Sequence, residues 1–171
     1  IYGRLLWRVR QAGLTHGIRG VLWHQGENDS GNDGPDGTNN YLFYQQYFVD
    51  MSAAWKQACP NLRNYFIYQV YPKPCGMGPY GDQLREVQRI LPTLYSPRMR
   101  VMSSVGLRGY NGCHYFTNGY EHMAYVLLPL VEQDIYGVGP SATNTAPTAI
   151  RPAISTPKVV MSRVSVSDCS A

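Results

Sequence analysis

The chain has 171 residues, of which 44% are hydrophobic and 15% are charged, a balance typical of a globular domain rather than a disordered chain. Its net charge is only +4, and the basic residues are scattered, so no footprint for binding nucleic acid is visible. No stretch approaches the roughly 20 consecutive apolar residues of a membrane span.

The first half of the chain alternates between predicted helix and strand. Residues 1–16 carry apolar side chains at helical spacing and predict a helix, and residues 18–23 predict a short buried strand. The loop at residues 25–39 is rich in Gly, Asn and Asp and predicts no regular structure. Asn40 is expected to cap a long helix that ends at Ala58.

The second half repeats this alternation. Residues 65–70 and 100–105 predict strands, and residues 82–91 and 119–136 predict helices. Because strands that alternate with helices pair in parallel, the order predicts an α/β fold with a parallel sheet. Three strands are few for such a sheet, and the chain begins with a helical pattern and no leader. We therefore expect a mature, trimmed or partial chain that forms the C-terminal part of a doubly wound domain.

Composition divides the chain into three segments. Residues 1–137 form the predicted domain, and residues 138–157 are rich in Pro, Ala and Thr and predict a linker. Residues 158–171 alternate like a β-strand, which covers this domain or begins another one.

The cysteines and the aromatic residues indicate an exported protein. Cys59, Cys75, Cys113 and Cys169 have no CxxC spacing, which disfavours a structural zinc site. Few lysines and many Asn, Tyr and Gly residues indicate a secreted or periplasmic protein, where a Cys59–Cys75 bridge can form; four reduced, buried cysteines fit nearly as well. The 14 tyrosines favour exposed binding surfaces, including surfaces that stack on sugars.

Two polar loops follow predicted strands. One is the second half of GVLWHQGENDSG (residues 20–31), and the other contains NGCHYFTNGYEHMA (residues 111–124). Ligands of open α/β sheets bind outside the carboxyl ends of the strands, so we expect both loops to lie at one edge. His114 is the candidate general base, and Asn111, three residues earlier, is placed to orient its ring. The plainer interpretations are a solvated, turn-capping loop and an ordinary loop histidine.

These two stretches, together with QLREVQR (residues 83–89), resemble the SGNH hydrolases. The resemblance is closest to the sialate O-acetylesterase-like and plant-type acetylxylan esterase-like carbohydrate esterases, and it runs from about Gly20 to Tyr136. It implies a three-layer α/β/α flavodoxin-like sandwich and a Ser–His–Asp mechanism without metal or cofactor. The implied reaction removes acetyl groups from acetylated carbohydrates.

The resemblance assigns roles to individual residues. His114 matches the catalytic histidine, and Gln25 matches an amide that helps hold the oxyanion. Gly26 allows the backbone to approach substrate closely. Glu27 and Asp29 match acidic positions that shape the loop.

His24 is expected at the rim of the site, which makes His24, Gly26 and Glu27 the candidate substrate-binding residues. A metal site built from His24, Glu27 and Asp29 is disfavoured because their spacing has no helical periodicity.

The chain departs from the family pattern in two ways. Ser30, Ser103 and Ser104 lie in the wrong places for a nucleophile elbow. The serine is therefore expected from the missing N-terminal part of the domain or from a complementing chain. Asn111 replaces the family's aspartate, and in another triad such a change lowers kcat by roughly 10⁴. Asn111 and the surplus of tyrosines favour the alternative class, a noncatalytic glycan-binding or structural cell-surface protein derived from an SGNH hydrolase. The intact Gln25–Gly26–Glu27 stretch and His114 favour the enzyme.

Overall fold

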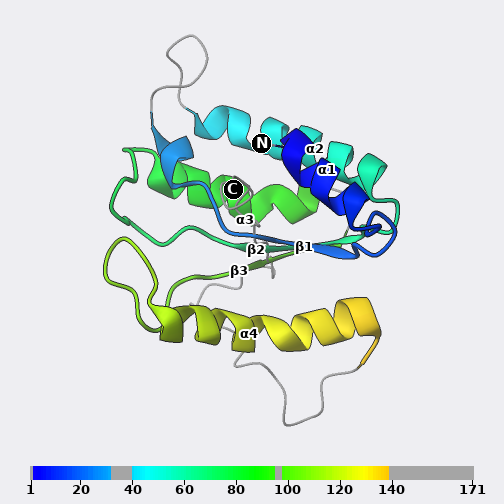
Figure 1. Ribbon diagram of the computed structural model, residues 1–171. Helices are drawn as coiled ribbons and strands as arrows, with labels where there is room; N and C mark the ends of the chain where they lie inside the picture. Colours follow the sequence, from blue (N-terminus) through cyan, green and yellow to red (C-terminus); the bar gives the residue numbers. More distant parts are fainter. Residues whose placement is uncertain (1, 32–39, 95–97, 139–171) are drawn as a thin grey trace.

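The computed structural model describes residues 2–31, 40–94 and 98–138 (Figure 1). Its elements, in chain order, are α1 (Tyr2–Gln11), β1 (Gly20–Trp23), the 3₁₀ helix η1 (Glu27–Ser30), α2 (Tyr41–Ala58), β2 (Asn64–Tyr68), α3 (Gly81–Leu94), β3 (Arg98–Met102) and α4 (Thr117–Tyr136). Apart from Val138, the predicted linker and strand-like tail lie outside the described residues.

The three strands form one parallel sheet in the order β1-β2-β3. Val21 pairs with Tyr65, and Tyr65 pairs in turn with Met99. The prediction of an α/β fold with a parallel sheet is confirmed.

Helices cover both faces of this sheet (Figure 1). α1, α2 and α3 lie on one face, and α4 lies alone on the other. All five residues of β2 are buried, and their side chains alternate between the two faces. Tyr65 and Ile67 join the core under α2 and α3, whereas Phe66 and Tyr68 join the core under α4.

Several element boundaries differ from the predictions. α1 ends at Gln11 rather than His16, and Gly13 follows with a positive φ of 65°, a conformation that glycine adopts without strain. The loop predicted to be irregular contains η1. Asn40 precedes α2 but makes no side-chain capping hydrogen bond; its main-chain oxygen accepts from Phe43 and Tyr44 instead.

Among the described residues, β1 pairs on one side only. The Arg19 carbonyl accepts a hydrogen bond from the Asn64 N–H, so Arg19 directs its backbone groups toward β2. Because residues of a parallel strand direct these groups alternately to the two sides, Gly20 and Leu22 direct theirs away from β2. The Leu22 side chain is also 40% exposed. We call this side of β1 the free edge.

Candidate functional site

The segment after β1 sends consecutive side chains to opposite sides of the sheet. Trp23 packs against Phe48 on the α2 side, and Gln25 lines a cavity with Trp23 there. His24 lies on the other side, with its ring near those of Tyr68 and Tyr115. The extended backbone causes this separation, so His24 and Gln25 belong to two different cavities.

The larger cavity has a volume of about 300 Å³ and contains three of the predicted site residues, His24, Glu27 and His114. We call it the histidine cavity. Its other lining residues are Tyr71, Cys75, Tyr110, Cys113, Tyr115 and Tyr120. The loops that follow β1, β2 and β3 all contribute to it, as expected for a site at the carboxyl edge of a parallel sheet.

The expectation that His24 lies at the rim is wrong, because its ring is largely enclosed within this cavity. Burial lowers the pKa of its imidazole, and the nearby Glu27 carboxylate partly opposes this shift. Its Nε2 atom is buried and has no hydrogen-bond partner among the described residues. The physical consequence is a neutral imidazole at neutral pH.

The loop that carries His114 is closed by Asn111. The Asn111 Oδ1 atom accepts hydrogen bonds from the N–H groups of Cys113 at 2.9 Å and His114 at 2.8 Å. The Asn111 N–H donates to the His114 carbonyl at 3.1 Å. Asn111 therefore shapes the main chain of the turn, and within the described residues the exposed His114 ring has no hydrogen-bond partner.

A disulfide ties this loop to the loop after β2. Cys75 bonds to Cys113, and the Cys75 N–H donates to the Gly112 carbonyl at 2.7 Å. Both cysteine predictions are therefore wrong: Cys59 is a free, buried thiol on the opposite side of the sheet from α4, and Cys75 is not reduced. The actual pairing depends on two loops that meet only in the folded sheet. Cys169 lies outside the described residues.

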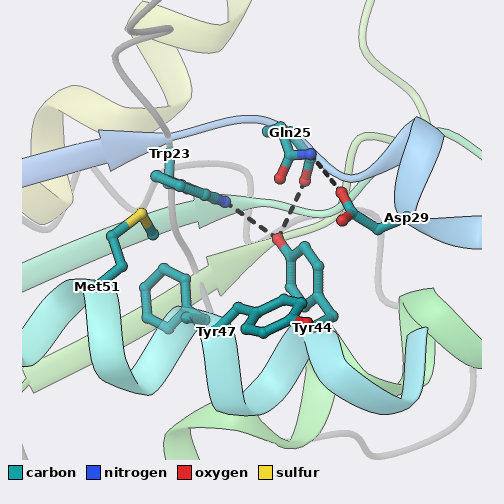
Figure 2. Close-up of a pocket in the computed structure, with 7 residues that line it drawn as sticks. Trp23, Gln25, Asp29, Tyr44, Tyr47 and Met51 are labelled. Atoms are coloured by element: carbon teal, nitrogen blue, oxygen red, sulfur yellow. Dashed lines mark hydrogen bonds between the residues drawn. The ribbon is translucent and has the colours of Figure 1, made fainter. Parts of the chain in front are cut away.

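The smaller cavity has a volume of about 180 Å³ and lies between β1 and α2 (Figure 2). We call it the glutamine cavity. Its floor contains Gln25, whose Nε2 donates to the Asp29 carboxylate. Asp29 thus fixes the direction of the Gln25 amide and leaves the second N–H of Nε2 available for another acceptor.

Two residues that the sequence did not single out hold the main chain at Gln25. The Tyr44 hydroxyl donates to the Gln25 carbonyl at 3.1 Å and accepts from the Trp23 indole at 3.0 Å. Gln88 is fully buried and donates to the same carbonyl at 3.0 Å, while its Oε1 accepts from the Val70 N–H. These contacts join β1, α2 and α3 behind the glutamine cavity. A polar residue on the buried face of a predicted helix was the available signal for Gln88.

Gly26 is required by packing. Its φ is 146°, and a Cβ atom there would lie 3.1 Å from both Gln88 Nε2 and Leu84 Cδ2. The glycine therefore lets α3 approach the end of β1, in addition to any contact with substrate.

No serine within the described residues lines the histidine cavity. Ser30 is buried, donating to the Glu27 carbonyl and accepting from the Gly78 N–H. Ser103 and Ser104 follow β3, and the Ser103 hydroxyl accepts from the Val105 N–H.

Comparison with models of protein families, with curated proteins and with solved structures found no match for this chain. Across residues 2–31, 40–94 and 98–138, no helix is long and apolar enough to span a bilayer. In the same residues, no group of three or more His, Cys, Asp or Glu side chains is close enough to bind a metal ion.

Proposed function

We propose that this chain contributes the histidine and the oxyanion amide of a carbohydrate O-acetylesterase related to the SGNH hydrolases. The observation that carries the proposal is that His114, His24 and Glu27, from loops after different strands, line one cavity at the carboxyl edge of the sheet. Parallel α/β sheets hold their ligands at this edge. The motif resemblance then supplies the reaction type.

In the proposed reaction, His114 acts as the general base. A serine hydroxyl attacks the acetyl carbonyl while His114 takes its proton. The resemblance assigns the oxyanion to the Gln25 amide; because Gln25 lines the glutamine cavity and His114 lines the histidine cavity, this role requires the strand that brings the serine to join the two cavities. Collapse of the tetrahedral intermediate expels the sugar oxygen, which receives the proton from His114. Water then hydrolyses the acetyl-serine by the same proton transfers and releases acetate.

The serine is proposed to come from a strand that pairs with the free edge of β1. This strand would belong to the N-terminal part of the same domain or to a complementing chain. Two features support such a partner: the backbone groups of Leu22, which pair with no other strand of the described residues, and its exposed side chain. A parallel strand there would extend the sheet toward a flavodoxin-like, three-layer sandwich and would end beside Gln25.

A secreted or periplasmic location is part of the same proposal. The Cys75–Cys113 disulfide supports it, because structural disulfides persist in oxidising compartments and are rare in the cytosol.

The test is hydrolysis of an acetylated xylo-oligosaccharide by the complete protein, including the segment that supplies the serine. We expect His114→Ala to lower kcat/KM by several orders of magnitude and Gln25→Ala to lower it by about 10²-fold, the usual effect of one oxyanion donor. His16→Ala, an exposed histidine that precedes β1, is the control and should retain activity. Unchanged hydrolysis by the His114→Ala protein would refute the proposal.

One observation favours a second candidate, a noncatalytic glycan-binding protein. The Asn111 oxygen is engaged by main-chain amides, and no carboxylate of the described residues is hydrogen-bonded to the His114 ring. Binding of a sugar without hydrolysis by the complete protein would support this candidate.

A further inference from the structure

Tyrosine rings form a continuous wall of the histidine cavity. Ring centroids lie 4.1 Å apart for Tyr71 and Tyr110, 4.7 Å apart for Tyr110 and Tyr115, and 6.2 Å apart for Tyr115 and Tyr120. Tyr115 is buried within this wall, and Tyr120, at one end of it, is 55% exposed. The planes of successive rings are tilted by 32°, 44° and 63° to one another, so the row presents ring edges, the exposed part of Tyr120 and hydroxyl groups. This mixture suits the apolar and polar surface of a sugar ring.

The charge in this cavity is negative. The Glu27 carboxylate lines it and makes no ion pair with a described residue, and no Lys or Arg side chain is among the described lining residues. Arg85 lies near Tyr71 and Tyr115, but its guanidinium donates to the Val70 carbonyl and to Gln69 Oε1. The charge of Glu27 also helps raise the pKa of Tyr110.

His24 adds no positive charge to the cavity at neutral pH. Burial lowers the pKa of His24, which keeps that ring neutral at neutral pH. A ligand that carries a carboxylate would therefore meet the Glu27 carboxylate with no Lys or Arg side chain among the described lining residues; the charged Arg85 near Tyr71 and Tyr115 is not part of that lining. A neutral ligand could instead donate its hydroxyl groups to Glu27.

We propose that the histidine cavity binds a neutral, hydroxyl-rich sugar, which packs on the tyrosine wall and donates hydrogen bonds to Glu27, and that the cavity discriminates against acidic sugars. This inference rests on the proposed function in taking a saccharide as the ligand, but it requires no catalysis. It assigns Glu27 to sugar selection and Tyr120 to the outer stacking surface.

The experiment is calorimetric titration of the full protein with three unacetylated probes of equal length. The probes are xylotetraose, which is neutral; tetragalacturonate, which is anionic; and fully deacetylated chitotetraose, which is cationic. We expect xylotetraose to bind at least tenfold more tightly than tetragalacturonate. Stronger binding of the anionic probe, equal binding of the two, or no binding of xylotetraose would overturn the inference. So would tightest binding of chitotetraose, because it would indicate a cation-binding aromatic cage instead.

Matched variants locate the binding. Tyr120→Ala should weaken xylotetraose binding about three- to tenfold, and Tyr120→Phe should retain it, because the ring supplies the stacking area. Tyr125→Ala is the control, since Tyr125 is 66% exposed on α4 and does not line the cavity. Glu27→Gln should reduce the ratio of the Kd for tetragalacturonate to the Kd for xylotetraose, because it removes the negative charge that repels the anionic probe.

A preference unchanged by Glu27→Gln would refute the role of Glu27. Loss of binding in the Tyr125→Ala protein but not in the Tyr120→Ala protein would place the ligand elsewhere. The probes carry no acetyl group, so the titration tests sugar binding independently of hydrolysis. Selective binding of xylotetraose without hydrolysis of an acetylated substrate would refute the proposed esterase but not this inference.

Discussion

The side chain of Asn111 supports its loop by accepting hydrogen bonds from main-chain N–H groups, so the effect of a substitution depends on whether the new side chain can also accept them. An aspartate there keeps an acceptor for the N–H groups of Cys113 and His114, whereas an alanine removes it. In an active esterase we expect Asn111→Asp to raise kcat, because the added charge stabilises the imidazolium formed during serine attack. The measurement is kcat/KM on an acetylated xylo-oligosaccharide.

The matched control for this prediction is Asn111→Ala. It should lower the free energy of unfolding by about 1–2 kcal/mol, because two hydrogen bonds to the Asn111 side chain are lost, while Asn111→Asp should not. A wild-type enzyme that is already fast, together with an Asp variant that is no faster, would show that Asn111 does not stand in the orienting position.

The burial of His24 predicts that the free energy of unfolding falls in mild acid. Burial lowers its pKa below the ordinary value of 6.5, so the unfolded chain binds a proton more readily than the folded protein does. The contribution of neutral His24 to stability is therefore full above pH 6.5 and is lost as the pH falls toward the lowered pKa. Urea unfolding at pH 7.5 and pH 5.5 measures this loss.

A substitution separates His24 from other titrating groups. His24→Phe should reduce the difference in unfolding free energy between the two pH values, whereas His16→Gln, at an exposed position, should leave it unchanged. An equal acid sensitivity of the wild type and the His24→Phe variant would contradict the assignment.

The positions of single residues were predictable from the sequence where the geometry of the backbone determines them. The site residues around His24 and His114 follow strands, and that signal placed them correctly at one edge. The separation of His24 from Gln25 follows from strand alternation and could have been inferred. The partners of Asn111 could not, because the choice between a ring and a main-chain amide depends on the turn conformation.

At the scale of elements, the Cys75–Cys113 disulfide is a covalent connection between the loops after β2 and β3. The two cysteines are 38 residues apart in sequence, and closing a loop of that size lowers the entropy of the unfolded chain by an amount equivalent to roughly 4 kcal/mol at most. We expect a Cys75→Ala/Cys113→Ala variant to lose about 2–4 kcal/mol of unfolding free energy, measured in urea.

Reduction tests the same bridge without a substitution. A thiol reductant should destabilise the wild type and leave the double variant unaffected, and Cys59→Ala should retain the full response of the wild type. A wild-type unfolding curve that does not shift after confirmed reduction would show that the loops are held by their other contacts.

The main helices and strands were predictable from hydrophobic periodicity alone. After Asn64, the central strand β2 reads as an apolar and aromatic run, and all five of its residues are buried. The predicted range is displaced from the strand by only one or two residues. By contrast, η1 consists of the polar residues Glu27–Ser30, and its packing depends on Gly78 approaching Ser30 from a distant loop. Local pattern carries no information about such a contact.

At the scale of the whole molecule, the free edge of β1 predicts self-association in the absence of a partner strand. Unpaired strand edges recruit other strands, and an inserted charge blocks such pairing. We expect Leu22→Lys to reduce association of residues 1–171, measured by sedimentation velocity. Leu42→Lys is the control, because Leu42 is 57% exposed on α2, away from the sheet. Concentration-independent monomers of the wild-type chain would contradict this expectation.

Because β2 lies between two paired strands, we expect its amide hydrogens to exchange with deuterium more slowly than the amide hydrogen of Leu22 in the edge strand β1. The β2 amides are buried and bonded within the sheet, so they should exchange with deuterium only when the whole domain opens. The Leu22 amide points away from β2 and has no hydrogen-bond partner within the described residues, so we expect it to exchange faster than the amides of β2. Its exchange rate would fall sharply once a strand paired there, and this one amide would report whether the sheet had gained its neighbour.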